Sequence, residues 1–160
     1  MSYEAELFAS LVDQITAGAP AFSTPIDAAR VFMALVPQTN RQWPAICIMF
    51  PSQPYSTGAW ATTGNKRDEK FIAQVGIAFQ VAPDSAHPYG DATTPGVLQL
   101  VTDVKNLLEN GFNTFRAACG ELVDYSISTS VFQSLDASPP LVTATMTIVF
   151  SVRVVAGARQ

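Results

Sequence analysis

The stretch from Val142 to Val155 reads VTATMTIVFSVRVV, and its alternation constrains the fold more strongly than any other part of the chain. Every even position from 142 to 154 is apolar, which predicts a β-strand with one face against a core. The odd positions carry Thr143, Thr145, Thr147 and Arg153, together with a serine. The functional question is therefore what this second, mostly uncharged face contacts.

Four other segments are predicted as strands or β-rich runs: 30–36, 45–50, 71–83 and 123–131. The first two flank PQTNRQWP, which reads as a turn or a longer hairpin loop. The segment 45–50 has little polarity on either face, which is typical of a central strand. The segment 71–83 again has one apolar face and one small, uncharged face. The turn LDASPP connects the last two strands, so we expect them to pair antiparallel.

Two helices are predicted from apolar residues at helical spacing. The first covers SYEAELFASLVDQITAGAP and ends near Gly18 and Pro20. The second covers TPGVLQLVTDVKNLLENG, where Thr94 suits the N-cap, Pro95 the first helical position and Gly111 the position past the end. The expected fold is a single α+β domain over residues 1–160: a mostly antiparallel sheet with the two main helices packed on one face. Two helices cannot cover both faces, so the threonine face must contact water or another molecule.

Residues 51–70 lack a regular pattern and are predicted to form an extended loop or hairpin arm. Its aromatic residues either anchor the arm on a neighbouring subunit or fold back on the body of the same chain. The charged run NKRDEK closes this segment. The predicted subunit-interface residues of the arm and the threonine face are Tyr55, Trp60, Lys66, Arg67, Asp68, Glu69, Thr143, Thr145, Thr147 and Arg153.

Charged residues make up 14% of the chain, against roughly 25% in an average soluble domain. This low value favours a surface largely covered by other subunits, since interface cores are depleted in charge, although a neutral, threonine-rich soluble domain is the alternative. The net charge of −4 and the absence of a basic block argue against tight nucleic-acid binding. The sequence shows no secretory signal and no stretch of 18 apolar residues, so no contact with a membrane is expected.

Residues that could carry chemistry are scattered. His87 is the one histidine and precedes a proline in a loop, and the sequence contains no nucleophile elbow and no phosphate-binding glycine motif. Cys47 and Cys119 are predicted to be buried thiols, with a disulfide as the alternative. Aspartates and glutamates fall mainly at element ends or on helix surfaces, where they solvate or cap. We therefore expect no enzyme activity, no cofactor and no metal site.

The segment VFMALVPQTNRQWPAICIMF resembles the strand–VPQ–loop–strand region of tail terminator and tail-completion proteins of long-tailed bacteriophages. The resemblance continues through FIAQVGIAFQV and LLENGF to the final threonine- and valine-rich strand, and covers about Val31 to Val155. The N-terminal helix is longer, and the middle richer in proline, than that family's pattern.

This resemblance implies a structural virion protein, assembled in the host cytoplasm. It would form a ring, expected to be a hexamer, that caps the head-proximal end of the tail tube. Its partners would be identical subunits, the tail tube protein and the head–tail connector protein, while DNA could pass through the ring without specific binding. Two alternatives stay open: another head–tail joint or tube-like protein, and an α+β protein that binds a small molecule with Tyr55, Trp60, His87 and Tyr89.

Overall fold

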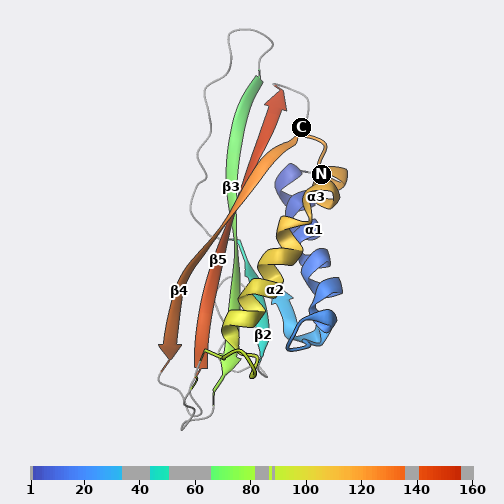
Figure 1. Cartoon of the computed structure of the whole chain (residues 1–160). Helices are drawn as coiled ribbons and strands as arrows, with labels where there is room; N and C mark the ends of the chain where they lie inside the picture. Colours follow the sequence, from blue (N-terminus) through green and yellow to red (C-terminus); the bar gives the residue numbers. More distant parts are fainter. Residues whose placement is uncertain are drawn as a thin grey trace.

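The computed structural model describes residues 2–33, 44–50, 66–81, 87, 89–135 and 141–155. The described chain is an α+β structure in which one twisted sheet carries the helices on one of its faces (Figure 1). The elements are α1 (Tyr3–Gly18), the 3-10 turns η1 (Ala19–Ala21) and η2 (Ala28–Arg30), β1 (Val31–Met33), β2 (Ala45–Met49), β3 (Lys66–Gln80), α2 (Val97–Glu109), α3 (Phe112–Ala118), β4 (Leu122–Leu135) and β5 (Leu141–Val155).

The sheet has the strand order β1-β2-β3-β5-β4. The pairs β2–β3, β3–β5 and β4–β5 are antiparallel, which confirms the mostly antiparallel sheet and the antiparallel pairing of the last two strands. The long strands β3 and β5 pair along their whole length, from Lys66 opposite Val155 to Gln80 opposite Leu141. Strand β2 is buried at every position and lies between β1 and β3, as its apolar character predicts.

The expected hairpin between the first two β-rich runs is wrong. The described part of the predicted segment 30–36 contains β1 (Val31–Met33), which pairs with β2 in parallel, with Val31 opposite Ile46. Parallel neighbours need a crossover connection rather than a turn. The residues of that connection, 34–43, lie outside the described ranges.

The core lies between the sheet and the helices. The even positions of β5 from Val142 to Val152 are all buried, as the alternation predicts. Aromatic rings fill one end of this layer: Phe150 stacks on Phe71 at a centroid distance of 5.0 Å, and Phe115 of α3 meets Phe150 edge-on at 5.2 Å. Such packing adds to the free energy gained from burying the apolar area.

Both main helices form where the sequence predicts them, but their ends differ in detail. Helix α1 includes Gly18 and continues into the 3-10 turn that contains Pro20. A Cβ on Gly18 would lie 2.7 Å from Leu107 Cδ2, so glycine allows α1 and α2 to approach closely. Helix α2 begins two residues later than expected, with Gly96 rather than Thr94 at the N-cap. The short helical turn expected after Gly111 is confirmed as α3.

Candidate subunit interface

The sheet face opposite the helices carries a patch without charge, which we call the threonine patch. It consists of six half-buried residues in three cross-strand pairs of β3 and β5: Gln74 with Thr147, Gly76 with Thr145, and Ala78 with Thr143. Because side chains alternate along a strand, these residues point away from the neighbours that fill the core. None of the described helices packs on this face (Figure 1).

Strand β2 extends this face with apolar residues. Ala45, Cys47 and Met49 share the face with the threonine patch and are buried, with exposed fractions of 2%, 6% and 7%. The side chain of Met49 lies over Gly76, where a Cβ would sit 3.4 Å from the methionine methyl group. The polarity of this face therefore increases from buried apolar side chains on β2 to half-buried threonine side chains on β5.

The first charge beyond the patch on this face is Lys70, four residues away on β3, and Asp68 and Arg153 follow six residues away, about 20 Å along the strands. Asp68 lies opposite Arg153, and Arg153 donates hydrogen bonds from Nε to Asp68 Oδ1 (2.8 Å) and from a terminal nitrogen to Oδ2 (3.1 Å). The hydrogen bond from Arg153 holds the pKa of Asp68 below its usual range, and Asp68 in turn raises the pKa of Arg153. The structure thus brings together two predicted interface residues that are far apart in the sequence. Both remain about half exposed, so the pair contributes little to stability.

Residues 66–70 belong to strand β3, so the expectation that they form part of an irregular arm is wrong. Their charges alternate between the two faces of the strand. Arg67 and Glu69 point to the helix side, where they form an ion pair. Glu69 is only 3% exposed, and burial raises the pKa of its carboxyl group. Lys66 and Lys70 lie on the same face as Asp68 and are exposed.

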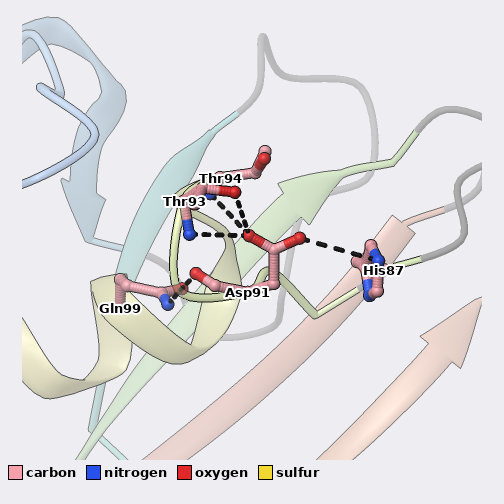
Figure 2. Close-up of polar contacts among 5 residues, drawn as sticks. All are labelled: His87, Asp91, Thr93, Thr94 and Gln99. Carbon is pink, nitrogen blue, oxygen red and sulfur yellow. Dashed lines mark hydrogen bonds and ion pairs between the residues drawn. The ribbon is translucent and has the colours of Figure 1, made fainter.

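A second polar cluster precedes α2 (Figure 2). Asp91 Oδ1 accepts hydrogen bonds from the amides of Thr93 and Thr94, both at 2.7 Å, and from the Thr93 hydroxyl at 2.8 Å. These bonds lower the pKa of Asp91 to about 2. His87 Nε2 lies 3.7 Å from the other carboxylate oxygen. Every donor to Oδ1 is local, so the carboxylate serves to shape the loop that leads into the helix.

Gln99 completes this loop from the first turn of α2. Its Oε1 accepts from the Gly96 amide at 3.0 Å, and its Nε2 donates to the Asp91 carbonyl at 2.9 Å. The sequence prediction of capping carboxylates identified the type of role, but Thr94 was assigned the position that Gly96 holds. An aspartate two residues before a pair of threonines, as in DATT from Asp91 to Thr94, is the signal for such a side-chain turn.

Other candidate sites find little support within the described ranges. His, Cys, Asp and Glu do not gather there in groups of three or more that could hold a metal ion. Cys47 and Cys119 are both buried thiols, as predicted, and do not form a disulfide. Two surface recesses are lined by residues other than His87 and Tyr89. Tyr55 and Trp60, the aromatic residues of the predicted arm, lie outside the described residues.

None of the described helices is long and apolar enough to cross a membrane. No protein-family model matches the chain, and no curated protein matches it. The resemblance to tail terminator proteins therefore depends on the residue pattern alone.

Proposed function

We propose that this protein is a structural subunit of a homo-oligomeric ring in the virion of a long-tailed bacteriophage. In this proposal the ring, a hexamer, closes the head-proximal end of the tail tube and contacts the tube protein on one side and the head–tail connector on the other. Its role is to end polymerisation of the tube and to join tail and head. The protein performs no catalysis and holds no cofactor in this role.

The observation that carries the proposal is the threonine patch on the helix-free face of the sheet. A free monomer usually keeps a charged surface, whereas the interior of an interface is depleted in charge. The six patch residues contain no ionisable group and are half-buried in the single chain. Gln74 and Thr147 also carry hydrogen-bonding groups of the kind that suit wet contacts between subunits.

The shape of the sheet fits the same role. Strands β3 and β5 pair over fifteen positions, which gives a long, stiff, two-stranded centre. A subunit of a ring needs two different surfaces that match each other on successive copies. The uncharged threonine patch and two distinct sheet edges provide several such surfaces on one small domain.

The test is the oligomeric state of the purified protein, measured by native mass spectrometry and negative-stain electron microscopy over a range of concentrations. The diagnostic variant is Thr145→Lys, which places a charge at the centre of the threonine patch. An unpaired charge in an interface costs several kcal/mol, so we expect association to weaken by about 100-fold or more. The matched control is Thr102→Lys, on an exposed position of α2 where the threonine hydroxyl donates to Leu98 O.

Rings formed by the wild type and by Thr102→Lys, but not by Thr145→Lys, would support the proposal. A wild-type protein that stays monomeric at every concentration would refute it. Copy number in purified virions separates the two structural alternatives, because a terminator is present as one ring whereas a tube-like protein is present in many.

A further inference from the structure

At one end of the sheet, the described residues form only three strands. Strand β2 pairs with β3 from Gln74 to Ala78, so Lys66–Ala73 has no partner on that side among the described residues. On the other side, β5 pairs with β4 from Leu122 onward. This end therefore has two open edges within the described part of the chain: β3 on one side and β4 on the other.

The β3 edge carries an excess of positive charge. Asp68 pairs with Arg153, and Glu69 pairs with Arg67, so each of these carboxylates is matched within the chain. Lys66 and Lys70 stand outside these pairs, and both side chains are exposed on the helix-free face. Among the described residues neither lysine forms an ion pair, although the charge of Lys70 contributes to the lowered pKa of Asp68.

The β4 edge carries a recess of about 320 Å³ lined by Glu109, Phe112, Asp124, Tyr125 and Ile127. The Phe112 and Tyr125 rings stack with centroids 6.1 Å apart, and the Tyr125 hydroxyl donates to the carbonyl of Leu108. Burial raises the pKa of Tyr125, with further contributions from Glu109 and Asp124, so both carboxylates act on the recess.

Carboxylates beside aromatic rings are suited to an alkylammonium group, which gains charge pairing and contact with the ring faces. Glu109 has an exposed partner in Lys105, whose Nζ lies 3.6 Å away. Asp124 accepts a hydrogen bond from the Tyr125 amide at 2.8 Å. One oxygen of Asp124 is thus engaged with the chain's own backbone.

We propose that this β4-edge recess binds Lys70 of a second copy of the chain, whose β3 edge lies against it in the assembly. The proposal depends on the ring proposed above and identifies the contact between its neighbouring subunits. Register supports the choice of Lys70: it pairs with Ser151 on β5, and Ser151 pairs with Asp124 on β4. The lysine and the aspartate therefore lie on the same row of the sheet, at opposite edges. By the same pairing, Lys70 and Asp124 also share the helix-free face, whereas Tyr125 lies on the helix side of β4. A rotation about an axis parallel to the strands keeps the row level, and in the proposal the lysine of one copy reaches the aspartate of the next at the rim of the recess.

This contact joins two different surfaces, and repetition of such a contact closes a ring when the rotation is a whole fraction of a turn. The two surfaces are opposite in charge, which favours the head-to-tail arrangement over contacts between two identical edges. Lys66, on the same face as Lys70, lies about 13 Å further along the strand and adds to the positive charge of the edge.

The experiment is a charge exchange measured by sedimentation and native mass spectrometry. We expect Lys70→Glu and Asp124→Lys each to weaken association about tenfold or more, since like charges then face each other. The double variant Lys70→Glu/Asp124→Lys restores the opposite charges and is expected to assemble within about threefold of the wild type. Asp13→Lys, on an exposed position of α1, is the control for a change in net charge, and circular dichroism establishes that each variant is folded.

The outcomes separate the two proposals. If the wild type assembles but both single variants assemble equally well, or if the double variant is not restored, the edge contact is wrong while the ring proposal stands. If the wild type never assembles, both proposals fail. Restoration by the double variant alone, with weak single variants, supports the contact.

Discussion

The aromatic cluster around Phe150 allows one prediction to be worked through in numbers. Phe150 is fully buried, stacks on Phe71, meets Phe115 edge-on at 5.2 Å and lies 5.8 Å from the Tyr125 ring. In the variant Phe150→Ala, loss of the buried apolar side chain costs about 2 kcal/mol. The cavity of about 100 Å³, at about 24 cal/mol per Å³, adds about 2.4 kcal/mol. The expected loss in the free energy of unfolding is therefore about 4 kcal/mol, a large part of the total stability of a domain.

The assay is urea unfolding followed by circular dichroism, at a fixed low protein concentration because association would also raise the apparent stability. Phe79→Ala is the matched control. Phe79 lies on β3 and points to the same core face of the sheet as Phe150, but it is only half-buried, near the end of its strand. We expect it to cost less than half as much as Phe150→Ala. A loss below about 1.5 kcal/mol for Phe150→Ala, or a loss no larger than that of the control, would show that the cluster does not organise the core.

Two further predictions concern the loop before α2. The pKa of Asp91 is depressed to about 2, so its contribution to stability is present above the ordinary value near 3.8 and is lost as the pH falls toward 2. The free energy of unfolding of Asp91→Asn, measured by acid unfolding, should therefore fall less than that of the wild type between pH 3.8 and 2. An equal fall in the two proteins would contradict the role of the carboxylate. In the second prediction, Gly90→Ala destabilises the chain by about 1–3 kcal/mol, because Gly90 has a φ of 96° and its Cβ would lie 2.7 Å from the amide nitrogen of Gly96. Thermal unfolding measures this loss, and a melting temperature equal to that of the wild type would count against it.

The sequence predicts those parts of the fold that local periodicity encodes. The alternation of β5 identified its core face residue by residue, because a strand exposes its two faces in turn. The stripe of Leu7, Leu11 and Ile15 placed α1 on the core for the corresponding reason at helical spacing. The fold class followed from the order of these elements.

The parts that were missed depend on partners distant in the sequence. Lys66–Lys70 has charges on both faces and lacks apolar alternation, so no local pattern marks it as a strand. It is a strand because β5 pairs with it, and Arg153 lies opposite Asp68 in that pairing. The parallel pairing of β1 with β2 was missed for a similar reason, since alternation says nothing about the direction of a neighbouring strand. The recess on the β4 edge joins two helices and a strand, and its residues carry no shared motif.

The position of β5 between β3 and β4 has a consequence for the order of events during synthesis. The two strands on either side are made before the strand that holds them together, so the sheet cannot close until residues 141–155 have left the ribosome. The pairing of β3 with β5 joins residues more than 60 positions apart, and pairings over long sequence separations form slowly. The same late strand supplies Thr143, Thr145 and Thr147, half of the surface proposed for assembly. If the threonine patch is the interface proposed above, a nascent chain is unable to associate with other copies before its own fold is complete.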